Sequence, residues 1–262
     1  MKHVCNFPQL PDKYDQALRE AVSFVLDRFK PVGIIATGTI IRGTPDSASD
    51  LDVWVIHLEP RRQRLQKFFN GVPAEIFVNP PWTIQKYFVQ DQEEARPISA
   101  HMMATGTVVL ATDPVVEQLR QTAFSLLSSP PALTPQKLTM ARYAAATKLE
   151  DAMDILDRNP AAATIVATEA VRQMLHFVFL KAGRFVPRDK DMLDALTNMD
   201  AELARKVQLF FESADSTKRM HLATELADRI LQVRGFFEWS SEPEEVAPPA
   251  ASACETQTPD SR

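Results

Sequence analysis

Two aspartates, Asp50 and Asp52, are the side chains in this chain best placed to do chemistry, because they begin an apolar, β-branched run. Successive side chains of a strand point to opposite faces, so the two carboxylates project side by side while Leu51 and Val53 face the core. Neighbouring carboxylates repel each other unless a cation lies between them, and hard oxygen ligands suit Mg²⁺ that carries a nucleotide's phosphates. The alternative is a solvent-facing strand with two unrelated aspartates.

A glycine turn precedes this pair. The segment Val32–Thr37 predicts a short buried strand that runs into Gly38, where glycine lets the backbone bend and approach a ligand. We expect a helix from about Thr39, whose first N–H groups and hydroxyl would donate to a phosphate. The glycines could instead be ordinary loop residues, but the chain has only seven, and Gly38 and Gly43 bracket this loop.

A third carboxylate follows in Glu75, within the predicted strand Gly71–Asn79. Alternation places Glu75, Phe77 and Asn79 on one face of that strand. If the strand pairs beside the Asp50–Asp52 strand, Glu75 completes an acidic cluster that holds a metal or accepts a proton from an attacking hydroxyl. A solvated strand end is the alternative.

The pattern Gly-Thr-x-x-Arg-Gly, a turn, Ser-Asp-Leu-Asp and a later strand glutamate resembles the nucleotidyltransferase superfamily with the DNA polymerase β-type fold. The resemblance is closest to the minimal nucleotidyltransferases and the aminoglycoside adenylyltransferases, and it covers about residues 30 to 80. Gly38 matches the motif glycine, and Thr39 keeps the hydroxyl of the usual serine. Arg42 and Ser49 match the motif residues that follow.

The resemblance implies a Mg²⁺-dependent enzyme that transfers a nucleoside monophosphate, by default AMP from ATP, to a hydroxyl of a small polar acceptor such as an aminoglycoside. Asp50 and Asp52 would hold the metal, and Glu75 would complete the cluster or act as the base. The nucleotide would contact Gly38, Thr39, Arg42 and Ser49. Two alternatives remain open: a regulatory or toxin–antitoxin-like protein acting on protein or RNA, and a nucleotide-binding protein without turnover.

The first half of the chain alternates strands and helices, which predicts an α+β region. Besides the strands above, we expect a strand at Thr107–Ala111. The expected helices are Asp12–Lys30, Arg61–Phe69, Trp82–Glu94, Ile98–Ala104 and Pro114–Leu127. The basic residues Arg61, Arg62 and Arg64 are expected to be solvated at a helix start, and the alternative is that they favour phosphates or a phosphorylated substrate.

The segment Ser128–Pro131 is the best domain boundary in the sequence. We predict a catalytic domain over 1–129, a bundle of about five helices over 132–239 and a disordered tail over 241–262. The last helix should reach about Phe237. The fold class is therefore a mixed sheet with helices followed by an α-helical bundle.

Charged groups in the second half offer further contacts. The basic turn Arg184–Lys190 would reach the triphosphate through Lys190, unless it is only a solvated loop. The acidic helical residues that would suit a cationic acceptor, unless they too are solvated, are Glu150, Asp151, Asp154 and Glu169. The roles of Arg172, His176 and Arg188 stay open.

Composition excludes several other classes. A net charge of −5 argues against a broad nucleic-acid surface, and the scattered tryptophans predict no base-stacking platform. His101 and Met102 are assigned to packing. Cys5 and Cys254 are too few and too distant for a disulfide framework. Because no signal peptide or membrane-length apolar run is found, we expect a cytoplasmic protein.

Overall fold

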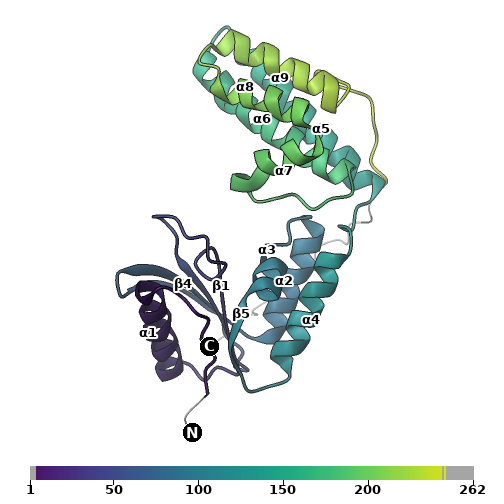
Figure 1. Ribbon diagram of the computed structural model, residues 1–262. Coiled ribbons are helices and arrows are strands. Elements are labelled where there is room, and N and C mark those ends of the chain that lie inside the picture. Colours follow the sequence, from purple (N-terminus) through teal and green to yellow (C-terminus); the bar gives the residue numbers. More distant parts are fainter. Residues whose placement is uncertain (1–3, 244, 246–262) are drawn as a thin grey trace, which may run out of the picture.

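The computed structural model describes residues 4–243 and 245 and has two parts (Figure 1). The N-terminal part contains a five-stranded sheet with helices on both faces, and the C-terminal part is helical. The α+β fold class predicted from the sequence is therefore confirmed. Among the described helices, none is long and apolar enough to cross a membrane.

The sheet has the strand order β3-β4-β2-β1-β5. The neighbours β2 and β4 are parallel, whereas the other neighbouring strands are antiparallel. Apolar residues dominate β1 and β2, because both faces of these central strands are covered. The strands are β1 (Gly33–Thr37), β2 (Leu51–Ile56), β3 (Gln63–Phe69), β4 (Val72–Asn79) and β5 (Thr107–Ala111).

One face of the sheet packs against α1 (Asp12–Arg28), seen beside the strands in Figure 1. Leu18 and Val22 of this helix share a buried cluster with Val53 of β2 and Ile76 of β4. This is the face expected for the residues that alternate with the aspartates and with Glu75. Burial of that apolar face against α1 therefore orients the carboxylates toward the opposite side of the sheet.

The opposite face packs against three helices, where Trp54 of β2 joins a second buried cluster with Ile84, Phe88 and Met103. Trp54 projects from the same side of β2 as Asp52, so these helices and the aspartate occupy the same face. The helices are α2 (Pro81–Glu93), α3 (Ile98–Thr105) and α4 (Val115–Ser128).

The C-terminal part is a bundle of five described α-helices (Figure 1). Its buried core runs from Ala145 to Leu231 and shares no described residue with the two clusters around the sheet. The elements are α5 (Pro135–Ile155), α6 (Pro160–Lys181), a 3-10 turn (Asp189–Asp191), α7 (Met192–Met199), α8 (Ala201–Glu212) and α9 (Ser216–Ile230).

The helix predicted over Arg61–Phe69 is wrong, because this segment forms β3 at the edge of the sheet. Its arginines, lysine and glutamines have good helix propensity, but pairing with β4 overrides that local preference. Asn70 and Gly71 link the two strands with φ of 45° and 72°. An Asn-Gly pair between two strands is a strong hairpin signal, and it was the clue available in the sequence.

Two further differences concern helix ends. No α-helix follows Gly38. The residues Thr39 to Gly43 form a turn, in which the Thr44 N–H donates to the Thr39 carbonyl. The last helix ends at Ile230 rather than near Phe237. Most of the predicted tail, with Cys254, lies outside the described residues, and Cys5 is a half-buried free thiol.

Candidate active site

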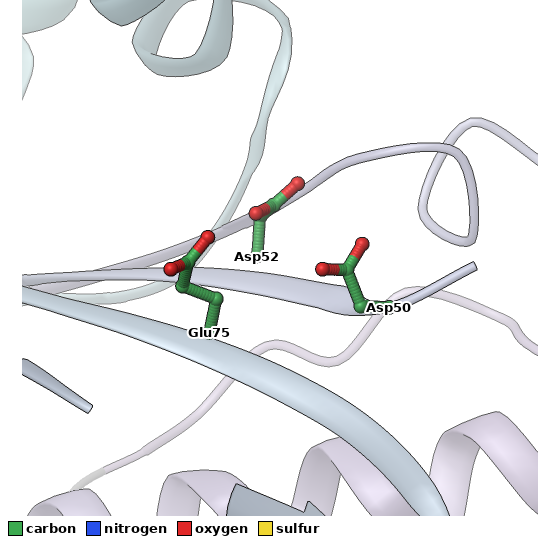
Figure 2. A group of neighbouring side chains, drawn as sticks. All are labelled: Asp50, Asp52 and Glu75. Carbon is green, nitrogen blue, oxygen red and sulfur yellow. The ribbon is translucent and has the colours of Figure 1, made fainter. Parts of the chain in front are cut away.

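Three carboxylates meet where β2 and β4 begin (Figure 2). Asp50 directly precedes β2, Asp52 lies within it, and the parallel register sets Asp52 opposite Glu75 of β4. An oxygen from each of the three half-buried side chains lies within 4.8 Å of the other two. The structure thus brings together the acidic cluster expected from the sequence.

The charges of this cluster are not balanced. Burial, followed by the nearby charges of Asp50 and Glu75, raises the pKa of Asp52 to about 6. A carboxylate that holds its proton this firmly needs a cation beside it to ionise easily. The oxygen donor set and its unfavourable charge both fit a divalent cation such as Mg²⁺.

Glu75 has a different environment because β3 supplies two donors to it. Arg64 donates through Nε to Glu75 Oε1 at 2.5 Å, and Gln66 donates to the same oxygen at 3.2 Å. The hydrogen bond from Arg64 lowers the pKa of Glu75. Glu75 is therefore ionised and held on the side of the cluster that faces β3.

Gly38 closes the other side of the cluster. Its φ is +95°, and a Cβ there would lie 2.8 Å from Asp52 Oδ2. Both the backbone conformation and the close approach of the carboxylate require glycine. The turn beyond it is tied together by the hydroxyls of Thr39 and Ser49, which lie 2.8 Å apart.

A cavity of about 1040 Å³ extends from the cluster between the two parts of the protein. The C-terminal part contributes the segment Phe185–Arg188, which is anchored where Val186 N–H donates to the Ala95 carbonyl at 2.8 Å. Five arginines line the cavity: Arg42, Arg62, Arg64, Arg96 and Arg188. Their positive charge suits a phosphate-bearing ligand.

The predicted site residues divide into two groups. Gly38, Arg42, Asp52 and Glu75 line the cavity, and Asp50 belongs to the adjoining cluster. Three predicted nucleotide contacts, Thr39, Ser49 and Lys190, are not among its lining residues. The charge of Lys190 instead acts on Asp46, whose pKa is lowered mainly by the Ser49 hydroxyl.

The acidic helical residues proposed for a cationic acceptor also lie outside this cavity. Glu169 accepts two hydrogen bonds from Arg172 at 2.8 Å and another from Gln173. Arg172 in turn lies 3.2 Å from His176. These contacts show a local network on α6, separate from the carboxylate cluster.

Sequence reasoning missed an aromatic cluster in the cavity wall. Trp54 stacks on Phe77 with ring centroids 5.2 Å apart, and Tyr87 meets Trp54 edge-on at 6.2 Å. Strand periodicity could have predicted part of it: Trp54 and Phe77 each lie two residues beyond a cluster carboxylate, and therefore on the same face of the strand as that carboxylate. The contribution of Tyr87 depends on how α2 packs on the sheet.

Four side chains that were not predicted as site residues also line the cavity, although Met102 packs against a buried cluster as expected. His101 and Met102 line the cavity and do not serve packing alone, and burial followed by the Arg42 charge lowers the pKa of His101. Arg62 and Arg64 were expected at a solvated helix start. They line the cavity instead, because β3 pairs next to β4.

No protein-family model and no curated protein matches this chain in sequence. Its structure is similar to the crystal structure of a nucleotidyltransferase-like protein from Exiguobacterium sibiricum 255-15. The TM-score is 0.52 and the sequence identity 15%, over 83% of this chain and 74% of that one. Together with the mixed sheet and its acidic cluster, this similarity shows that the chain has the nucleotidyltransferase fold.

Proposed function

We propose that this protein is a Mg²⁺-dependent nucleotidyltransferase. It would move a nucleoside monophosphate, with ATP as the first donor to test, to an acceptor hydroxyl and release pyrophosphate. The observation that carries this proposal is the cluster of Asp50, Asp52 and Glu75, whose oxygens lie within 4.8 Å of one another. This cluster lies beside the Gly38 turn at the end of an arginine-lined cavity.

The cluster residues would hold the metal through their carboxylate oxygens, with Asp52 between the other two. When bound, a divalent cation neutralises the charge on the phosphate oxygens during transfer. The raised pKa of Asp52 supports this assignment, because burial, followed by the charges of Asp50 and Glu75, disfavours the ionised carboxylate when no cation lies beside it.

The phosphates of the donor belong on the Gly38 side of the cluster. There the chain passes directly beside Asp52 without a side chain in the way, and Arg42 lines the same cavity. Arg188 approaches from the C-terminal part and adds a second guanidinium. Guanidinium groups bind phosphate oxygens with two parallel hydrogen bonds, so these arginines would orient the triphosphate.

The acceptor belongs on the Glu75 side. In phosphoryl-type transfer the attacking and leaving oxygens are roughly in line, so a pyrophosphate leaving near Gly38 requires attack from across the cluster. The acceptor oxygen forms a bond to the α-phosphorus as the bond to pyrophosphate breaks. We assign Glu75 to receive the hydroxyl proton, which requires that Arg64 give up its present contact.

An aminoglycoside acceptor was suggested by the family resemblance and by acidic residues on the helices. The acidic helical residues that suggested a cationic molecule do not line the cavity, whereas five arginines and only three acidic residues do. Acceptor tests should therefore include both cationic and anionic molecules.

The proposal is tested by incubating the full chain with labelled ATP, CTP, GTP or UTP, Mg²⁺ and a panel of hydroxyl acceptors. The panel contains aminoglycosides, aromatic phosphates that also carry an alcohol group, proteins and RNA. Transferred label with equimolar pyrophosphate, lost in Asp50→Asn and Asp52→Asn, is the expected result. Saturable Mg²⁺–nucleotide binding without transfer to any acceptor would show a binding protein, and no binding would refute the proposal.

A further inference from the structure

We propose that the acceptor is a planar ring that carries an anionic group as well as the accepting hydroxyl, bound on the side of the cavity that faces β3 and α2. This inference rests on the proposed function and specifies its acceptor. The site, which we term the aromatic–arginine subsite, consists of Trp54, Phe77, Tyr87, Arg62 and Arg64.

The rings of this subsite form a stacked wall. Trp54 and Phe77 lie nearly parallel, with an interplanar angle of 20°, whereas Tyr87 meets Trp54 at 68°. All three rings line the cavity. Trp54 is buried, at 3% exposed, whereas Phe77 and Tyr87 are half-buried. Phe77 lies against Trp54, and the Arg64 guanidinium now lies over the Phe77 ring, so a planar ligand would stack on Phe77 in the place that Arg64 occupies.

The positive charge lies at the edge of this wall. Arg62 donates to the Tyr87 hydroxyl at 3.0 Å, and it forms no ion pair with any described residue. The Tyr87 hydroxyl donates in turn to buried Asn79 Oδ1 at 3.2 Å, which fixes the ring. Because a guanidinium has five N–H donors, Arg62 keeps several donors for an anion.

Arg64 provides the second cation. Its guanidinium carbon lies 4.9 Å from the centre of the Phe77 ring, and its side chain is 67% exposed. Its present partner is Glu75, a carboxylate that the proposed function uses for metal and proton. When Glu75 binds the metal or takes up the proton, Arg64 loses its partner and needs another anion. An anionic group on a ring that stacks against Phe77 would lie within reach of Arg64.

The position of the subsite assigns the ring to the acceptor and not to the donor base. The strand order places β3 three strands from β1, or roughly 14 Å at about 4.8 Å per strand. The donor phosphates belong at the Gly38 turn after β1, so Arg64 of β3 lies across the cluster from them, while Trp54 and Phe77 lie two residues beyond the carboxylates on β2 and β4. That is the side from which an in-line attack must come.

The first experiment is calorimetric titration of the full chain with phenyl phosphate after loading with Mg²⁺ and α,β-methylene-ATP. No transfer occurs, because phenyl phosphate has no alcohol group and the methylene bridge is not cleaved. We expect phenyl phosphate to bind at least about 10-fold more tightly than inorganic phosphate, since stacking adds to the anion contact. Benzyl alcohol and kanamycin are expected not to bind.

Variants then test the residues of the subsite. Arg62→Gln and Arg64→Gln should each weaken phenyl phosphate binding by about 10-fold, because each removes a charge-assisted contact. Phe77→Leu should reduce the affinity to that of inorganic phosphate. Arg61→Gln is the matched control: this exposed arginine pairs with Glu59 at 2.8 Å, does not line the cavity and should leave binding unchanged.

Several results would overturn the inference. These are equal binding of phenyl phosphate and inorganic phosphate, no effect of either subsite arginine, or preferential binding of kanamycin. Displacement of the nucleotide analogue by phenyl phosphate would assign the rings to the donor. If the analogue binds but phenyl phosphate does not, only the subsite fails. If Mg²⁺ and the analogue do not bind, or bind equally well to Asp52→Asn, the proposed function itself fails.

Discussion

Asp52 is the residue at which stability and the proposed chemistry oppose each other. Its pKa is about 6 in the folded protein against 3.8 for the free side chain. Between pH 4 and 6 the folded state therefore binds more protons than the unfolded state. The free energy of unfolding contributed by this carboxyl decreases as the pH rises through that window and stays low above it.

We therefore expect metal-free Asp52→Asn to be more stable than wild type at pH 7.5, by about 1 kcal/mol after allowance for solvent screening. The difference should close near pH 4, where Asp52 is protonated. Urea unfolding in EDTA at both pH values measures it, with exposed Asp27→Asn as the control. The variant should also lose stabilisation by Mg²⁺ and ATP. Lower stability than wild type at pH 7.5 would contradict this account of the cluster.

Glu75 permits a second prediction at this scale. If it receives the proton, Glu75→Gln should lower the transfer rate by roughly 10²–10⁴-fold while Mg²⁺–nucleotide affinity changes little. Single-turnover rates and calorimetric titration of the same variant separate the two quantities. A parallel loss of nucleotide affinity would make Glu75 chiefly a metal ligand. A wild-type rate would show that it has neither role.

Among the elements, the Gly38 turn depends most on one residue type. Gly38→Ala would place a methyl group 2.8 Å from Asp52 Oδ2 in a backbone conformation with φ of +95°. We expect a loss of stability of about 1–2 kcal/mol and loss of detectable nucleotide binding. Thermal unfolding and calorimetry test this, with Gly43→Ala as the control, since a Cβ there meets nothing within 4 Å although its φ is also positive. If both variants lose the same stability and nucleotide affinity, the close approach of Gly38 to Asp52 is not the cause of the loss.

The start of α3 depends on a buried carboxylate. Asp91 of α2 accepts the Ala100 N–H at 2.8 Å, although burial raises its pKa to about 6. Asp91→Ala should cost about 1–2 kcal/mol of stability, because it leaves N–H groups of the first helical turn unpaired. Asp91→Asn keeps an acceptor oxygen and should lose less. If the two variants unfold at the same urea concentration, the cap contributes nothing.

At the scale of the whole molecule, the segment Phe185–Arg188 completes the cavity from the C-terminal part. Arg188 lines the cavity whereas Lys190, two residues later, does not. We expect Arg188→Gln to weaken nucleotide binding by about 10-fold and Lys190→Gln to change it less than 2-fold. Calorimetry with Mg²⁺ and α,β-methylene-ATP measures both. The reverse order would restore the phosphate contact first predicted for Lys190.

The two parts also differ in what they can do alone. The buried clusters around the sheet use no described residue beyond Leu127, so a chain ending at Ser129 should fold. It should bind Mg²⁺–nucleotide weakly and transfer nothing, because the wall formed by Phe185–Arg188 is missing. Circular dichroism and the pyrophosphate assay test these points. Full transfer activity would show that the bundle is no part of the site.

Much of the carboxylate cluster could be predicted because its causes are local. Asp50, Asp52 and Glu75 alternate with apolar residues, and the period of two assigns them to the polar face of a strand whatever lies around it. Gly38 was recognisable because a turn with positive φ depends on the residue type itself. The helical C-terminal half was visible in long apolar periodicity bounded by prolines and a glycine.

The errors arose where distant contacts overrule local preference. The segment Gln63–Phe69 has good helix formers, but its backbone hydrogen-bonds to β4. That pairing carries Arg64 to Glu75, so the misassigned element also concealed two cavity arginines. The turn after Gly38 was expected to continue as a helix, yet the Thr39–Ser49 contact holds it as a short loop.

The sequence by itself determined which residues are chemically capable and which face of a strand they occupy, because side-chain type and strand period act over a few neighbouring residues. Only the tertiary structure decided what surrounds them. The register of β2 on β4, the docking of α2 and the approach of Phe185–Arg188 join residues far apart in the chain. These long-range contacts depend on how apolar faces pack together, and no local pattern specifies that packing.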